Sequence, residues 1–171
     1  MKTTLILPLT FALMAPAGFA DDHTALIDQA RSAAPAMISA NASIMINGEI
    51  VVEGSNGWVC MPETMPGDNS PNCSDKVWME MFKAVGDKGD FSPSAVGVSY
   101  MLAGDQGTSN SDPYHPTPKS ADDFIKEGPH VMVIVPRAML TGLTDDPDSG
   151  EPYVMWGDTP YAHIMIPVAD R

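Results

Sequence analysis

The chain has 171 residues and is strongly acidic, with 22 Asp and Glu residues against 9 Lys and Arg residues and a net charge of −13 at pH 7. Nucleic acids and anionic membrane surfaces are bound mainly through Lys and Arg, so this balance argues against both as partners. The length is that of one domain with its own hydrophobic core.

Residues 1–20 have the pattern of a secretory signal peptide. Lys2 precedes a short apolar run, and small residues occupy the positions that a signal peptidase reads, at Gly18 and Ala20. The run is too short for a membrane span, which needs about 20 apolar residues. We therefore expect cleavage after Ala20 and a single soluble domain at 21–171, periplasmic or extracellular, without membrane insertion.

The mature chain is predicted to open with an amphipathic helix over 23–39, where apolar residues recur at helical spacing. Pro35 lies inside this pattern and is expected to kink or shorten the helix. Two short β runs follow at 43–46 and 49–53, and the Asn-Gly pair between them is the preferred pair for a type I′ turn. This part of the sequence predicts a helix followed by a β-hairpin.

The two cysteines, Cys60 and Cys73, enclose a stretch rich in Pro, Gly and Asn. An exported protein folds in an oxidising compartment, where a disulfide is the expected outcome. The spacing is not C-x-x-C, which argues against a redox or metal role for the pair. We predict a disulfide that closes a loop with little secondary structure and stabilises the fold by about 3 kcal/mol.

A second helix is predicted to start at Ser74 or Asp75, either of which serves as its N-cap. Apolar residues at helical spacing continue until Gly86 and Gly89, which are expected to end it. A strand is predicted to follow at about 95–102.

The remaining elements alternate between polar and apolar segments. We expect a long polar loop at 104–119, a short helix at 120–128, a central strand at 131–135, a helical turn from Pro136, and a β-hairpin within 153–166. The sum predicts an α+β domain, with a mostly antiparallel sheet, two or three packed helices and one disulfide.

Two predicted strands repeat a His-x-Met pattern, at His130 and Met132 and again at His163 and Met165. Residues i and i+2 of a strand point to the same face. If the two strands are neighbours, two imidazoles and two thioethers converge, and this ligand set suits copper, above all Cu(I). The pattern therefore favours a copper-binding or small-ligand-binding module with these four residues as metal ligands.

The same pattern has a structural interpretation. Methionine commonly fills gaps in protein cores, and a histidine in an apolar strand is usually a hydrogen-bonded core residue. In that case both histidines stabilise the fold without binding a ligand.

The polar loop is a second candidate site, because functional residues often lie on loops that follow a strand. Its candidate side chains are Asp105, Ser109, Asn110, Asp112 and His115. A serine hydrolase would use Ser109 or Ser111 as its nucleophile and His130 or His163 as its base. The G-x-S-x-G elbow is absent, however, and turn-rich loops contain the same residue types for structural reasons. Calcium bound by Asp105 and Asp112 is a further alternative, although their spacing fails the EF-hand pattern.

Four segments carry a resemblance to known sequences, at 57–62, 109–114, 128–132 and 159–165. With these segments the chain resembles an uncharacterised group of small exported bacterial proteins, over most of the chain from about residue 40 onward. The resemblance implies no activity, ligand or site residue. A non-catalytic structural or interaction protein of the envelope is therefore a third hypothesis beside ligand binding and hydrolysis, and whether the protein is an enzyme stays open.

Overall fold

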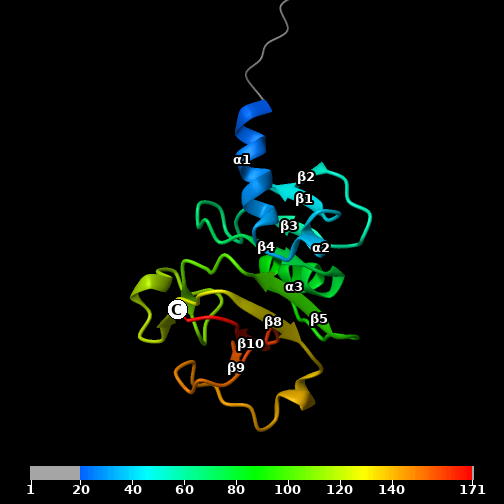
Figure 1. Cartoon of the computed structure of the whole chain (residues 1–171). Helices are drawn as coiled ribbons and strands as arrows, with labels where there is room; N and C mark the ends of the chain where they lie inside the picture. Colours follow the sequence, from blue (N-terminus) through cyan, green and yellow to red (C-terminus); the bar gives the residue numbers. More distant parts are fainter. Residues whose placement is uncertain (1–19, 171) are drawn as a thin grey trace, which may run out of the picture.

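The computed structural model describes residues 20–170, so the predicted signal peptide lies almost wholly outside the described residues. The described chain forms an α+β domain, as predicted (Figure 1). Its main sheet has eight strands in the order β2-β1-β3-β4-β5-β8-β10-β9, mostly antiparallel, and β6 and β7 form a separate pair. The helices are α1 (Ala20–Arg31), α2 (Ala36–Ser39) and α3 (Lys76–Asp87), with 3-10 turns at Pro118–Ser120 and Arg137–Leu140.

The strands are short. Their bounds are β1 (Ser43–Ile46), β2 (Glu49–Val52), β3 (Val59–Met61), β4 (Asn72–Ser74), β5 (Gly97–Met101), β6 (Thr108–Ser109), β7 (Phe124–Ile125), β8 (His130–Ile134), β9 (Tyr153–Met155) and β10 (His163–Pro167). The strand predicted at 131–135 is central, since β8 lies between β5 and β10 in the sheet.

The predicted helix over 23–39 is divided in two. The helix α1 ends at Arg31, and α2 begins after Pro35, which is its N-cap. Proline has no N–H to donate and disfavours helical geometry in the residue before it, so the helix is broken at the position where a kink was predicted.

The predicted hairpin that follows is confirmed, because Asn47 and Gly48 both have positive φ, at 52° and 81°, as a type I′ turn requires.

Cys60 and Cys73 form the predicted disulfide and lie directly opposite each other on the antiparallel strands β3 and β4. The expectation of little secondary structure was wrong at both ends of this loop, which the two strands occupy. Inside it, the carboxylate of Asp68 accepts hydrogen bonds from the N–H groups of Thr64, Met65 and Ser70. The loop is therefore ordered by one side chain as well as by the covalent bond.

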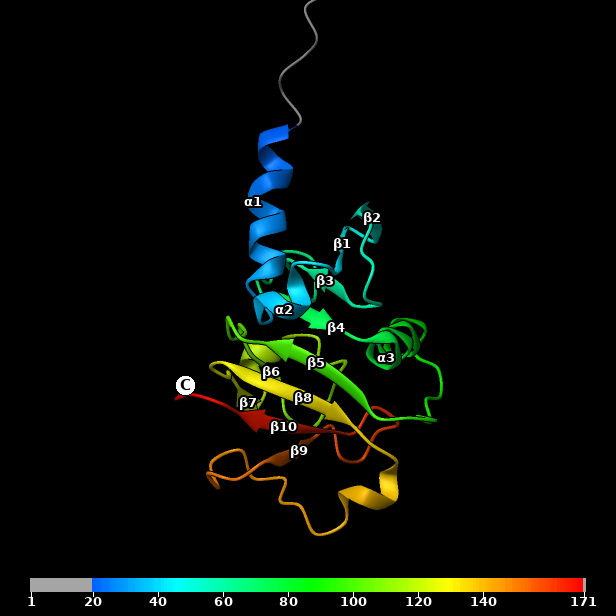
Figure 2. The ribbon, with the colours of Figure 1, turned by 45° about the vertical axis from the view of Figure 1, so that its right-hand side comes forward.

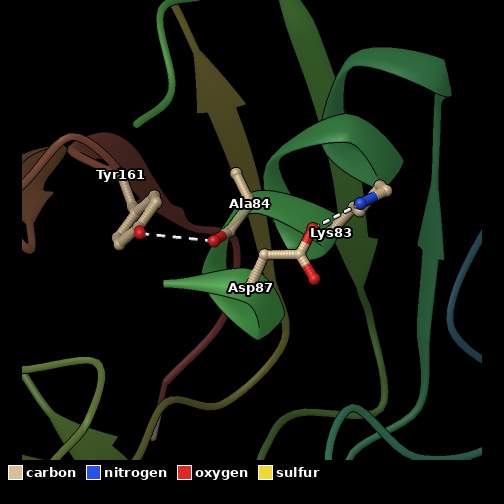
Figure 3. Close-up of polar contacts among 4 residues, drawn as sticks. All are labelled: Lys83, Ala84, Asp87 and Tyr161. Carbon is tan, nitrogen blue, oxygen red and sulfur yellow. Dashed lines mark hydrogen bonds and ion pairs between the residues drawn. The ribbon is translucent and has the colours of Figure 1, made fainter. Parts of the chain in front are cut away.

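The predicted start of the second helix is confirmed at Asp75. One carboxylate oxygen of Asp75 accepts the N–H of Trp78 at 3.0 Å, and the other accepts the N–H of Val98 at 2.7 Å. The same side chain thus caps α3 and fixes it to β5. At the other end, the hydroxyl of Tyr161 lies 3.3 Å from the carbonyl oxygen of Ala84, which ties the last turn of α3 to the segment before β10 (Figure 3).

Replacing Asp75 by Ala is expected to lower the free energy of unfolding by about 2 kcal/mol, because both bonds to backbone donors are lost. Asp87→Ala is the matched control. Asp87 is exposed and pairs only with Lys83 on the same helix, so its loss is expected to cost under about 0.5 kcal/mol (Figure 3). Urea unfolding of the two variants checks the difference, and equal costs would show that Asp75 does not fix α3.

The helix predicted at 120–128 is wrong. The segment contains the end of a 3-10 turn and then β7, which pairs with β6 from the polar loop. Asp123, within this segment, accepts the N–H of Ser111 at 2.8 Å. Its carboxylate therefore holds two segments side by side in place of capping a helix.

Two helices cover opposite faces of the main sheet (Figure 2). Ala30 of α1, with Leu26 and Ile27, packs against the face that carries the disulfide. Trp78 and Met81 of α3 pack against the other face, where the buried side chains of β5, β8, β10 and β9 gather. We call this second face the inner face, and both His-x-Met patterns belong to it.

Candidate functional site

The two strands with the His-x-Met pattern are neighbours in the sheet. Strand β8 pairs antiparallel with β10, with Met132 directly opposite Met165 and His130 opposite Pro167. Alternate residues of both strands are buried on the inner face, and these include all four predicted ligands. The neighbouring strands and the shared face agree with the sequence-based hypothesis.

The register nevertheless separates the two imidazoles. His163 precedes Ile164, which lies opposite Val133, so His163 stands four residues further along β8 than His130. At about 3.3 Å per residue the two Cα atoms are about 13 Å apart. The register therefore offsets the two imidazoles by four residues along the sheet and does not place them side by side.

Two further methionines lie beside the histidines. Met101 of β5 is directly opposite His130, and Met155 of β9 is directly opposite His163. Both are buried on the inner face. Each imidazole therefore has one methionine across the sheet and another two residues along its own strand. The sequence pattern missed Met101 and Met155, because cross-strand neighbours depend on a register that the sequence does not show.

Both imidazoles have the same hydrogen-bond pattern. Nδ1 of His130 donates to the carbonyl oxygen of Gly128 at 2.7 Å, and Nδ1 of His163 donates to that of Tyr161 at 2.9 Å. A carbonyl oxygen only accepts, so the proton sits on Nδ1. In both rings Nε2 is buried and has no hydrogen-bond partner among the described residues. Metal-binding histidines have this arrangement, with one nitrogen tied to the protein and the other available.

The surroundings of His163 are aromatic. Its ring is edge-on to Trp78 and to Trp156, with ring centroids 5.1 Å apart in each pair. The pKa of His163 is lowered to about 4, mainly by burial; the hydrogen bond to Tyr161 opposes the shift and the positive charge of His130 adds to it. His163 is therefore neutral at pH 7.

The free energy of unfolding of the metal-free protein is expected to fall as the pH drops from about 6.5 to about 4. In this range the unfolded chain protonates His163 and the folded chain does not, because the pKa moves from 6.5 to about 4 on folding. The loss is expected to reach about 3 kcal/mol. Urea unfolding at several pH values measures it, and His163→Gln is the control. An equally steep fall in that variant would assign the effect to other groups.

The surroundings of His130 contain two carboxyl groups. Asp105 accepts the N–H groups of Gly107 and Glu127, both at 2.9 Å. Burial raises the pKa of Asp105, and the positive charge of His130 opposes this rise, so the two groups interact. Glu127 is 2% exposed and accepts a hydrogen bond from the hydroxyl of Tyr153 at 2.8 Å. The two ends of the inner face therefore differ in the side chains around them.

The Ser109 side chain of the polar loop bonds within the loop and to Asp123. The hydroxyl of Ser109 is buried, donates to Asp123 at 2.9 Å and accepts the N–H of Asp112 at 3.0 Å. Ser111, the second candidate nucleophile, donates its N–H to Asp123. Among residues 20–170, no serine hydroxyl forms a hydrogen bond with an imidazole. The serine-hydrolase hypothesis therefore lacks the contact it needs.

The other candidate side chains of the loop also bond to nearby backbone. Asn110 donates to the carbonyl oxygen of Asp145, and Nδ1 of His115 accepts the N–H of Thr117. Asp112 accepts the N–H of Tyr114. Within the described part of the chain, no three His, Cys, Asp or Glu side chains are arranged to hold a metal ion, which gives no support to calcium at Asp105 and Asp112.

Two shallow hollows lie on the surface near α3. One, of about 180 Å³, is lined mainly by residues of the segments 91–93 and 135–140. The other, of about 440 Å³, lies along α3 and has Lys83 and Asp87 among its lining residues. Figure 3 shows these two side chains on the helix. Neither hollow is lined by His130 or His163. Both unpartnered nitrogen atoms are buried.

Comparison with known proteins finds no matching family model, no similar curated protein and no similar solved structure. The likeness to small exported bacterial proteins stays a prediction from the sequence. A helix that is long and apolar enough to cross a bilayer is not found among residues 20–170.

Proposed function

We propose that this protein is an exported copper-binding module that holds Cu(I) on the inner face of its sheet, through methionine thioethers and a histidine imidazole. The observation that carries the proposal is the pair of buried, unpartnered Nε2 atoms among methionines. A buried polar atom without a partner costs about 1–3 kcal/mol. A ligand that supplies the missing bond removes this cost.

Cu(I) is the ion that these side chains suit best. Thioethers are soft ligands and prefer Cu(I), and imidazole accepts the same ion. Met132 and Met165 lie opposite each other between the two histidines. The cost of burying an ion rises steeply with its charge, so a monovalent ion is easier to accommodate in this interior than a divalent one. Hard cations would need clustered carboxylates, which the described residues do not form.

Export supports the same role. The pattern of residues 1–20 is that of a secretory signal, and the Cys60–Cys73 disulfide suits an oxidising compartment. With both cysteines in the disulfide, the chain offers no free thiolate to compete for the ion. Methionine and histidine then remain as its soft ligands.

The proposal is tested on protein purified from a bacterial periplasm, by metal analysis and by anaerobic Cu(I) titration against a chromophoric chelator. We expect stoichiometric Cu(I) binding that the His130→Gln/His163→Gln double variant loses. Met139→Leu is the control, because Met139 is 62% exposed and remote from the inner face. If the wild-type protein binds no Cu(I) and its melting temperature does not change, the two Nε2 atoms are structural and the proposal is wrong.

A further inference from the structure

The geometry points to the His130 end of the inner face as the binding site, with His130, Met101 and Met132 as the ligands and His163 as a structural core residue. The inference rests on the proposed function and goes beyond it, because it selects one of two histidines. It also adds Met101, which no sequence pattern indicated.

The register places three soft ligands around one point. Met101 is directly opposite His130 on the neighbouring strand, where Cβ atoms of facing residues are about 4.5–5.5 Å apart. Met132 follows His130 by two residues and points to the same face. The three side chains thus come from two adjacent, hydrogen-bonded strands, and their relative positions are fixed by the sheet.

The register alone does not choose between the two ends, because His163 has an equivalent pair in Met155 and Met165. The neighbouring side chains distinguish them. A cation in a low-dielectric interior needs a nearby negative charge to offset its desolvation. Asp105 interacts electrostatically with His130, and Glu127 adds a second carboxyl group close to Asp105. The ring of His163 instead packs against two indoles.

Access distinguishes the two ends as well. Met101 and Met132 are 5% and 6% exposed, against 3% for Met155 and 1% for Met165, while both histidines are fully buried. Strand β5 ends at Met101, and the polar loop begins directly after it. An ion that enters beside this loop meets Met101 first. The other histidine lies beneath α3, whose Trp78 contacts its ring.

The structure supplies matched variants for a test. Met101→Leu and Met155→Leu each remove one thioether opposite a histidine, at nearly constant volume. His130→Gln and His163→Gln remove the corresponding imidazoles. We expect Met101→Leu and His130→Gln to weaken Cu(I) binding by about 100-fold or more, since even the loss of outer-shell partners costs about 10–100-fold. Met155→Leu and His163→Gln are expected to bind as the wild type does. Affinities come from anaerobic competition with a Cu(I) chelator, and stoichiometry is expected to be one ion per chain.

The possible outcomes separate this inference from the proposed function. Loss of binding in the Met155 and His163 variants, or in all four, overturns the inference and leaves the proposed function standing. A wild-type protein that binds no Cu(I) overturns both.

A second measurement covers the case in which a histidine variant does not fold. The ¹³C-methyl NMR signals of methionine are recorded on the wild-type protein during titration with Ag(I), a redox-stable substitute for Cu(I). We expect the Met101 and Met132 methyl signals to shift while that of Met155 stays; a shift of Met155 alone contradicts the inference.

Discussion

Cu(I) is expected to raise the free energy of unfolding of the metal-free protein by about 4 kcal/mol when the free ion is held at about 1,000 times its dissociation constant. The stabilisation arises because the ligands come together only in the folded sheet, where β5 and β8 place Met101 opposite His130. For a chain of this length it corresponds to a rise in melting temperature of about 10 °C. Thermal unfolding in an anaerobic Cu(I) buffer measures it.

Zinc and a ligand variant provide the controls for this experiment. Zinc prefers nitrogen, thiolate and carboxylate ligands, and both cysteines are in the disulfide, so zinc is expected to change the melting temperature little. Met101→Leu is expected to remove most of the rise caused by Cu(I). Equal stabilisation by zinc and copper would indicate binding to surface carboxylates, and the absence of any rise with copper would contradict specific binding.

Replacing both Cys60 and Cys73 by Ala is expected to lower the free energy of unfolding by about 3 kcal/mol. The bond closes a loop with a sequence separation of 13 residues, and its main effect is to restrict the unfolded chain. Both cysteines are fully buried against α1, so alanine keeps the site apolar. Urea unfolding measures the change.

Met65→Leu serves as the control within the same loop, because Met65 is 65% exposed. Its stability is expected to match that of the wild type. If the double variant were as stable as the wild type, the network around Asp68, which accepts three backbone N–H groups, would be sufficient to hold the loop. The assignment of the disulfide as a major source of stability would then be wrong.

Local sequence signals predicted the elements that local chemistry determines. The Asn47-Gly48 turn, the Asp75 cap and the break at Pro35 are each specified by one or two residues with restricted backbone or hydrogen-bonding behaviour. The central strand β8 was recognisable because both of its faces are apolar. These features need no knowledge of the remaining chain.

The errors arose where long-range pairing decides the structure. Strands β3 and β4 are only three residues long, and they are held in place by pairing with each other and with β1 and β5. The segment 120–128 has a helix-like start, but β7 pairs with β6 and Asp123 bonds across the loop. Neither contact is visible in the local sequence.

The candidate site shows the same division. The His-x-Met repeat predicted that each histidine shares a face with its methionine, and the pairing of β8 with β10 fulfils the condition that the two strands are neighbours. It did not indicate the four-residue offset between His130 and His163, which follows from the register of β8 and β10. The same register brings in Met101 and Met155, which the pattern had passed over. A pattern of alternating residues predicts a face of the sheet, and only strand pairing determines which residues of that face meet.

X-ray absorption spectroscopy at the copper edge of the Cu(I)-loaded protein identifies the atoms bound to the ion and so shows whether methionine and histidine hold it. We expect two sulfur neighbours and one nitrogen neighbour, with one sulfur lost in Met101→Leu and the spectrum unchanged in Met155→Leu. A spectrum with only oxygen and nitrogen neighbours would place copper on surface side chains and contradict a methionine–histidine site.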